Sequence, residues 1–141
     1  MSGGSAIEAI HATCVAIGGR GVLIAGPSGS GKSDLALRLM DRGAILVSDD
    51  YTSVTRVGGV LEARAPTNIA GRIEVRGIGI VEREVLECAP VALYVAASPT
   101  PERMPEAALQ MIAGIGIRRI ELALLEASAP IKVELALELE A

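Results

Sequence analysis

A glycine-rich stretch that ends in lysine and serine, GPSGSGKS at residues 26–33, most constrains the fold of this chain. It fits the pattern GxxxxGK[ST], in which glycines turn backbone N–H groups toward phosphates, the lysine reaches the outer phosphates and the last hydroxyl ligates Mg²⁺. A flexible Gly/Ser turn is the alternative, but an apolar run precedes the stretch and apolar residues at helical spacing follow it. We therefore predict a phosphate-binding loop made of Gly26, Pro27, Ser28, Gly29, Ser30, Gly31, Lys32 and Ser33.

The composition suits one α/β domain that spans all 141 residues. Half of the chain is apolar but it holds no Phe or Trp, so Ala, Val, Ile and Leu must build the core, as in a sheet packed against helices. A net charge of -4 gives no general attraction for nucleic acid or for an acidic membrane surface. The chain shows neither a secretion signal nor a membrane-spanning run, so we expect a cytoplasmic protein.

The two cysteines, Cys14 and Cys88, each lie beside apolar residues and not in a metal-binding spacing. This pattern argues against a zinc site and favours buried free thiols in a reducing compartment over a disulfide.

Local patterns predict a mixed central sheet flanked by helices, after a flexible N-terminus at residues 1–9. The C-terminal segment also alternates like a strand, but its Ala, Leu and Glu content favours a helix. The expected elements are a hairpin at 11–25, a helix from Ser33 to the stop at Gly43, a buried central strand at 44–48, a hairpin at 51–64, a structured loop at 65–82 with a short strand at 73–75, a core strand at 90–97, a helix at 106–112, a strand at 117–124 and a helix at 128–141.

Two adjacent aspartates, Asp49 and Asp50, follow the apolar strand at 44–48. They are candidates for metal-side carboxylates or a general base, and the alternative is the start of a capped loop. Because adjacent side chains of a strand point to opposite sides, we expect one aspartate to face the site and the other to face away.

Other candidate residues lie before and after this pair. His11 is the only histidine and would lie near the glycine loop if the hairpin forms, although a lone histidine is more often structural or exposed. Glu74 and Arg76 lie among apolar residues and glycines, which indicates either a site role or a salt-bridged edge strand. Arg103 and the pair Arg118 and Arg119 carry weaker signals, and for them solvated charges are the default.

Taken together, these residues resemble the catalytic domain of the HPr kinase/phosphorylase family. The resemblance rests on the order of His11, the loop at 26–33, the sequence LVSDD ending in Asp50, IEVRGIGIV at 73–81 and ERMP around Arg103. It implies a P-loop fold of the phosphoenolpyruvate carboxykinase-like kind and a kinase that uses ATP and Mg²⁺ to phosphorylate a serine of the phosphocarrier HPr. It also implies a role in the phosphotransferase system and in regulating carbon metabolism.

The resemblance also implies roles for single residues. Lys32 would contact the phosphates, and Ser33 with Glu74 would hold Mg²⁺. Asp50 would accept the proton of the substrate serine, His11 would assist it and Arg103 would be a catalytic arginine. Residues 73–81 would form the signature segment used in both directions of the reaction.

Two departures from the family pattern shape the expected activity. This chain resembles the short form without the family's N-terminal domain, and it lacks a basic motif of the PVRPGR type, which the family uses in dephosphorylation. Kinase activity is therefore favoured over phosphorylase activity. The family forms hexamers, so a homo-oligomer is one option for this chain.

Two alternative functions remain open. The chain could be a nucleotide-sensing module that regulates a partner by contact without transferring phosphate. It could instead be a kinase of a small hydroxylated metabolite, although no cluster of aromatic or polar residues suggests a pocket for one.

Overall fold

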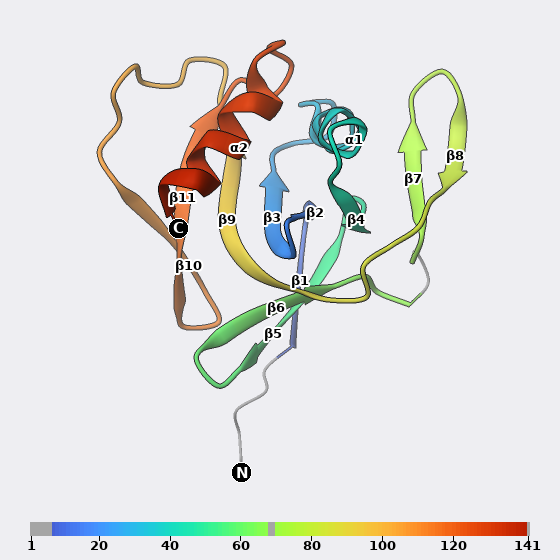
Figure 1. Cartoon of the computed structure of the whole chain (residues 1–141), viewed down its shortest axis with the longest axis horizontal. Helices are drawn as coiled ribbons and strands as arrows, with labels where there is room; N and C mark the ends of the chain where they lie inside the picture. Colours follow the sequence, from blue (N-terminus) through green and yellow to red (C-terminus); the bar gives the residue numbers. More distant parts are fainter. Residues whose placement is uncertain (1–6, 68–69, 141) are drawn as a thin grey trace.

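A long curled sheet with two helices on one side forms the body of the protein (Figure 1). The computed structural model describes residues 7–67 and 70–140. Within them, nine strands pair in the order β1-β5-β6-β9-β3-β2-β4, with β11 beside β9 and β10 beside β11, and β7 and β8 form a separate hairpin. The strands are β1 (Ile7–Ile10), β2 (Ala12–Ile17), β3 (Arg20–Ala25), β4 (Ile45–Ser48), β5 (Thr52–Val57), β6 (Val60–Arg64), β7 (Arg72–Val75), β8 (Gly79–Glu82), β9 (Ala89–Ala97), β10 (Ala108–Ile112) and β11 (Ile115–Leu122), and the helices are α1 (Lys32–Asp41) and α2 (Ala129–Glu140).

Strand β9 is the branch point of this sheet. It pairs in parallel with β3 along one edge and in parallel with β11 along the other, while its first two residues pair antiparallel with β6. The remaining strand pairs are antiparallel, so the sheet is mixed. This confirms the predicted fold class, an α/β domain with a mixed sheet and flanking helices.

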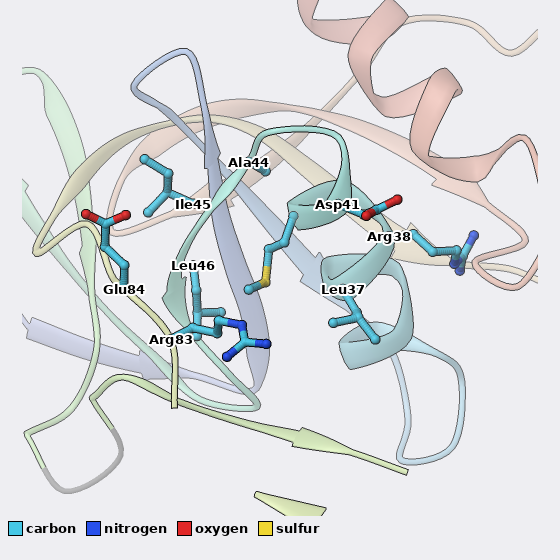
Figure 2. A pocket seen from close by; sticks show the side chains of 9 residues that line it. Leu37, Arg38, Asp41, Ala44, Ile45, Leu46, Arg83 and Glu84 are labelled. Carbon is cyan, nitrogen blue, oxygen red and sulfur yellow. The ribbon is translucent and has the colours of Figure 1, made fainter. Parts of the chain in front are cut away.

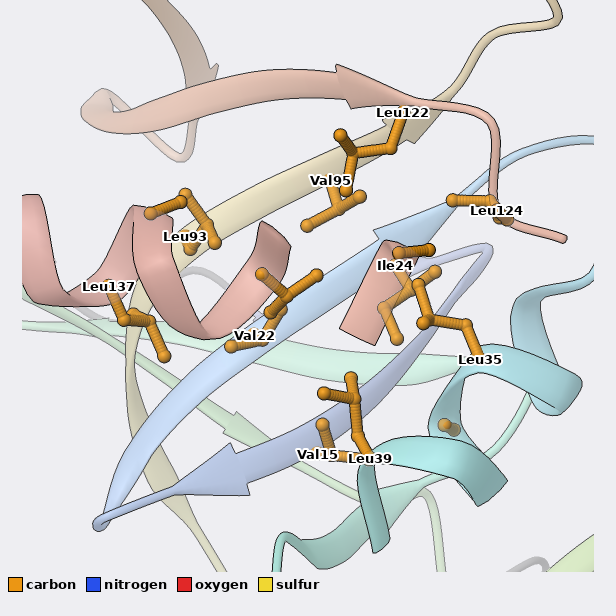
Figure 3. Close-up of a cluster of buried hydrophobic side chains, with 14 of the residues drawn as sticks. Val15, Val22, Ile24, Leu35, Leu39, Leu93, Val95, Leu122, Leu124 and Leu137 are labelled. Carbon is orange, nitrogen blue, oxygen red and sulfur yellow. The ribbon is translucent and has the colours of Figure 1, made fainter. Parts of the chain in front are cut away.

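Both faces of the sheet are packed, because alternate residues of its central strands point to opposite sides. Val15, Val22 and Ile24 lie on the face covered by the helices, where they pack with Leu35 and Leu39 of α1 (Figure 3). Cys14 and Leu23 lie on the other face, in a second buried cluster that includes residues of β5, β6, β10 and β11. Small and aliphatic side chains thus form two core layers, one on each side of the sheet.

Most of the predicted elements are confirmed. The hairpin at 11–25 turns at Gly18 and Gly19, both left-handed with φ of 58° and 81°, and the hairpin at 51–64 turns at Gly58 and Gly59. Helix α1 ends before Gly43, which has a φ of 108°, and the C-terminal segment is helical. The segment at 65–82 is more regular than expected, because β8 completes a hairpin with β7.

Three expectations were wrong. Residues 106–112 do not form a helix, because β10 pairs antiparallel with β11 across the turn at Ala113 and Gly114, and this pairing overrides the helical propensity of its Ala, Leu and Met residues. The strand at 44–48 is largely buried but not central. Within the described residues, β4 ends the strand order and pairs only with β2 and, through Leu46, with Val85.

The third concerns the N-terminus. Residues 7–9 belong to β1, which pairs with β5, whereas residues 1–6 of the predicted flexible segment lie outside the described residues. In the part of the chain that the structure describes, neither helix is long and apolar enough to cross a membrane.

Candidate functional site

The glycine loop connects the end of β3 to the start of α1, which is the arrangement that the sequence pattern requires (Figure 1). Gly29 and Gly31 have left-handed backbones with φ of 84° and 104°, so side chains at these positions would be strained. Lys32, only 6% exposed, donates from Nζ to the carbonyl oxygens of Gly26 at 2.7 Å and Pro27 at 3.3 Å. The loop therefore curls around its own lysine, and the N-terminus of α1 opens into it.

Asp49 is a buried carboxylate that connects three parts of the site. Its Oδ1 accepts hydrogen bonds from Ser33 Oγ at 2.6 Å and from Thr13 Oγ1 at 3.1 Å, and its Oδ2 accepts one from the backbone N–H of Glu74 at 3.0 Å. The residue is 7% exposed. This carboxylate thus joins the glycine loop, strand β2 and the β7–β8 hairpin at one point.

Asp50 faces the same cavity as Asp49, so the expectation that only one aspartate faces the site was wrong. Its backbone is left-handed, with a φ of 67°, and this breaks the alternation of a strand. Asp50 Oδ1 lies 2.9 Å from His11 Nε2, and the two side chains are 57% and 41% exposed. Tyr51 stacks on the His11 ring with the ring centroids 4.9 Å apart.

The position of His11 follows from the pairing of β2 with β3. Ala12 lies opposite Ala25, so His11 and the first residue of the glycine loop sit at neighbouring strand ends, as the hairpin predicted. The structure therefore brings His11, Lys32, Ser33 and Asp50 into one region of the molecule.

A cavity of about 420 Å³ is bordered by Lys32, Ser33 and Asp50, whereas His11 contacts Asp50 and is not among the lining residues. Glu74 and Arg76 line it from the β7–β8 hairpin, and Leu125 lines it from the segment after β11. Glu74 forms no ion pair among residues 7–67 and 70–140, so the alternative of a salt-bridged edge strand does not hold for it. The cavity is lined by Ser28, Gly29, Gly31, Lys32, Ser33, Asp34, Asp49, Asp50, Glu74, Val75, Arg76 and Leu125.

Arg103 lies apart from this cavity. It is exposed in the segment between β9 and β10 and is not among the residues that line the cavity. Arg118 and Arg119 belong to β11, where Arg119 donates to Gln110 and Glu121 and lies over the ring of Tyr94.

A second cavity, of about 510 Å³, lies beside the C-terminal half of α1 (Figure 2). It is lined by aliphatic and charged residues of α1, β4 and the segment after β8, among them Leu37, Ile45 and Arg83. None of the predicted site residues borders it, so it does not belong to the site around the glycine loop.

Cys14 and Cys88 are both free thiols, as the sequence favoured, but only Cys14 is buried and Cys88 is half-buried. Complete burial raises the pKa of the Cys14 thiol from 9.0 to about 12. In the described part of the chain, no three or more His, Cys, Asp and Glu side chains are grouped as a metal site.

The chain runs from a strand through a glycine loop into a helix, and two carboxylates follow another strand of the same sheet. This arrangement defines a domain of the P-loop class. The HPr Serine kinase C-terminal domain family matches residues 5–86, more than half of the chain. The chain belongs to this family.

Individual relatives agree with this assignment. The HPr kinase/phosphorylase of Clostridium kluyveri is 44% identical over 77 residues, which are 55% of this chain and 25% of that protein. The HPr kinase/phosphorylase of Alkaliphilus metalliredigens is 49% identical over 74 residues, which are 52% of this chain and 24% of that protein. The match thus spans about a quarter of the length of these curated relatives.

A solved structure covers much more of the chain. The HPr(Ser) kinase/phosphatase from Coxiella burnetii superposes with a TM-score of 0.80 at 29% sequence identity, over 95% of this chain and 99% of that one. Its similarity extends beyond the family match at residues 5–86 to the strands and helix that follow.

The sequence alone did not assign three residues that the structure places at the site. The sequence marked Asp49 as a candidate but did not assign it a role. In the structure, Asp49 and not Asp50 contacts the Ser33 hydroxyl of the glycine loop. Thr13 and Tyr51 gave no recognisable signal, because their contacts depend on how β1, β2 and the turn after β4 come together.

Proposed function

We propose that this chain is an ATP- and Mg²⁺-dependent kinase that phosphorylates a serine hydroxyl of an HPr-like phosphocarrier protein. One observation carries the proposal: the exposed carboxylate of Asp50, in contact with His11, lines the same cavity as Lys32 and Ser33 of the glycine loop. A carboxylate that faces solvent at the end of a phosphate-binding loop is placed to meet the acceptor of a phosphoryl group.

The glycine loop fits the phosphates of ATP. Its backbone and the N-terminus of α1 provide the donors and the positive dipole end that phosphate oxygens require. Among the described residues, Lys32 Nζ donates only to loop carbonyls, so the phosphates would offer it stronger, charged acceptors. Ser30 Oγ is buried without a hydrogen-bond partner in the described chain, which also favours a ligand at this loop.

The donor set beside the loop fits Mg²⁺. We propose that Ser33 and Glu74 hold the ion together with Asp49, whose carboxylate already contacts the Ser33 hydroxyl at 2.6 Å. Mg²⁺ is usually held by one or two carboxylates and by substrate phosphates, which agrees with a site that is no dense cluster of ligands. When bound, the ion would neutralise charge on the phosphates.

In the proposed transfer, the serine oxygen bonds to the γ-phosphorus of ATP, the bond to the bridging oxygen breaks and ADP leaves. The hydroxyl proton moves to Asp50, whose carboxylate accepts it as the new bond forms. His11 Nε2 holds Asp50 Oδ1 at 2.9 Å and so orients the carboxylate. Lys32 orients the phosphates at the glycine loop.

The reverse reaction would use the same groups by microscopic reversibility, with Asp50 returning the proton as phosphoserine reacts with inorganic phosphate to give pyrophosphate. The proposal favours the kinase direction, because residues 117–137 hold no motif of the PVRPGR type. The proposal keeps Arg103 as a catalytic arginine on the family resemblance alone.

The remaining parts of the proposal concern the cellular setting. An HPr-like partner places the protein in the cytoplasm, within the phosphotransferase system and the regulation of carbon metabolism. Nucleic acid and membranes are not partners in this proposal, and a homo-oligomer is allowed by it.

The test replaces the proposed base. Purified wild-type chain and the Asp50→Asn variant are incubated with Mg-ATP and the host's HPr-like protein, and phosphoserine is measured by mass spectrometry. We expect the variant to lose about 10²–10⁴-fold in rate, the usual contribution of a positioned base, while it keeps its affinity for nucleotide. Asp41→Asn, an exposed carboxylate at the end of α1, is the matched control and should transfer normally.

Two outcomes would contradict the proposal. Normal transfer by Asp50→Asn would show that another group accepts the proton. Tight nucleotide binding by the wild type with no transfer to any HPr-like protein, but with partner binding that changes with the nucleotide, would favour the sensing module.

A further inference from the structure

Thr13 is a polar residue that is fully buried in the middle of an apolar strand. Strand β2 reads ATCVAI, and Thr13 is 0% exposed within it. Burying a hydroxyl costs free energy unless the group is hydrogen-bonded, so its hydrogen-bond partners indicate the role of the residue.

The Thr13 hydroxyl lies between the two aspartates of the site. Its Oγ1 donates to Asp49 Oδ1 at 3.1 Å and accepts from the backbone N–H of Asp50 at 3.0 Å. A hydroxyl has one proton to give and can accept others, so both contacts are satisfied at once. No other side chain of the described residues forms hydrogen bonds to both Asp49 and Asp50.

The contact with Asp50 supports a strained backbone. Asp50 has a φ of 67°, a left-handed conformation that a residue with a side chain adopts only when its surroundings hold it there. Two further contacts fix the same corner: Tyr51 N–H donates to Asp49 O at 2.7 Å, and Thr52 Oγ1 donates to Ala12 O at 2.8 Å. The left-handed turn is what points Asp50 into the cavity beside Asp49.

The contact with Asp49 fixes the rotation of a carboxylate. Ser33 and Thr13 both donate to Oδ1, while the Glu74 N–H donates to Oδ2. Without the Thr13 hydroxyl, Oδ1 would keep only the Ser33 contact, and Ser33 itself belongs to the glycine loop.

We infer that Thr13 is the positioning residue that sets the two site carboxylates relative to each other, holding Asp49 against the loop hydroxyl and Asp50 toward the acceptor. The inference rests on the proposed function for its effect on rate, although the geometry itself does not. Thr13 is buried beneath the carboxylates and does not touch the reacting atoms, so it acts through them.

Thr13→Val separates this role from a purely structural one. Valine is similar in shape to threonine but neither donates nor accepts a hydrogen bond, so β2 keeps its packing and loses only the link between the aspartates. Thr13→Ser keeps the hydroxyl and loses a methyl group. Thr55→Val, on the half-buried side of β5, is a matched control for the same change away from the site.

The first measurement needs no substrate. His11 is the only histidine of the chain, so its ring signals in an NMR spectrum are unambiguous, and they report its contact with Asp50. We expect Thr13→Val to move these signals, and Thr13→Ser and Thr55→Val to leave them near their wild-type positions. Thr13→Ala, which creates no crowding, should behave like the valine variant and replaces it if that variant does not fold.

The second measurement is phosphoryl transfer to the HPr-like protein under the conditions used for Asp50→Asn. For Thr13→Val we expect kcat to fall by about 10²-fold, the effect of a misplaced reacting group, with little change in nucleotide affinity. Thr13→Ser should restore most of the rate.

The outcomes separate the two proposals. If the wild type transfers no phosphate, the proposed function fails, and the His11 signals alone still decide the role of Thr13. Wild-type His11 signals in the valine and alanine variants would overturn the inference. So would a loss of stability in these variants with unchanged kcat per folded molecule, or a serine variant as impaired as the valine variant.

Discussion

The first glycine of the loop, Gly26, has no room for a side chain, and Gly26→Ala is therefore a sharp test of how the loop is packed. A Cβ at this position would lie 2.6 Å from the Cβ of Ala97 at the end of β9 and 2.6 Å from Ser30 Oγ. The Ser30 side chain can rotate away, but the Ala97 Cβ is fixed to the backbone. The backbone of Gly26 is not left-handed, so the substitution changes space and not backbone strain.

Because carbon atoms do not approach so closely, either the loop or the end of β9 must move. Overpacking of this kind costs about 1–3 kcal/mol in the free energy of unfolding. For a chain of this size, each kcal/mol lowers the melting temperature by about 4 °C. If the loop is the part that moves, nucleotide affinity falls as well, by about tenfold for each 1.4 kcal/mol of lost binding free energy.

Urea denaturation and nucleotide titration of Gly26→Ala would measure both effects. Gly59→Ala is the matched control, because a Cβ there meets nothing within 4 Å and its backbone is not left-handed. Its stability should stay within about 0.5 kcal/mol of wild type. Ala97→Gly should rescue part of the loss, so that the double variant is more stable than the sum of the single changes predicts.

Two results would refute this reasoning. Gly26→Ala with wild-type stability and affinity would show that the loop has more space than the distances imply. Strict additivity of Gly26→Ala and Ala97→Gly would show that the contact with Ala97 is not the cause of the loss.

Three further predictions concern groups outside the cavity. Arg103→Ala should slow phosphoryl transfer by at least about tenfold if Arg103 is catalytic, and an unchanged rate in the transfer assay would remove it from the proposal. For the cysteines, a thiol reagent should modify Cys88 before Cys14 in the folded protein, because only Cys14 is fully buried. Burial raises the pKa of Cys14 from 9.0 to about 12, so the folded state holds a proton that the unfolded state loses above pH 9. Its contribution to stability is thus complete below pH 9 and is lost between pH 9 and 12, with a slope of at most about 1.4 kcal/mol per pH unit that Cys14→Ala should remove in urea denaturation.

Much of the fold could be predicted because its signals are local. The glycines at 18–19 and 58–59 lie between alternating apolar runs, a pattern that predicts the two hairpins seen in the structure. The loop at 26–33 predicts both the strand before it and the helix after it. Residues 106–112 were misjudged because their Ala, Leu and Met content favours a helix, whereas the deciding factor is pairing with β11. The turn residues Ala113 and Gly114 were a signal for that hairpin.

The candidate site was predictable as a set of residues but not as a geometry. Periodicity predicted that Asp49 and Asp50 point to opposite sides, and a left-handed backbone at Asp50 is not visible in a strand pattern. The role of Thr13 depends on the pairing of β2 with β4, whose register shifts after Cys14, and sequence alone does not give that register.

The place of β9 in the sheet has a consequence for how the protein is made. The segment that identifies the family ends at residue 86, before β9 begins at Ala89. Until β9 leaves the ribosome, β3 has one unpaired edge, and Val22 and Ile24 lack the neighbours Leu93 and Val95. The glycine loop therefore gains its rigid support late in translation, and a fragment cut at the family boundary would expose an apolar sheet edge that invites aggregation.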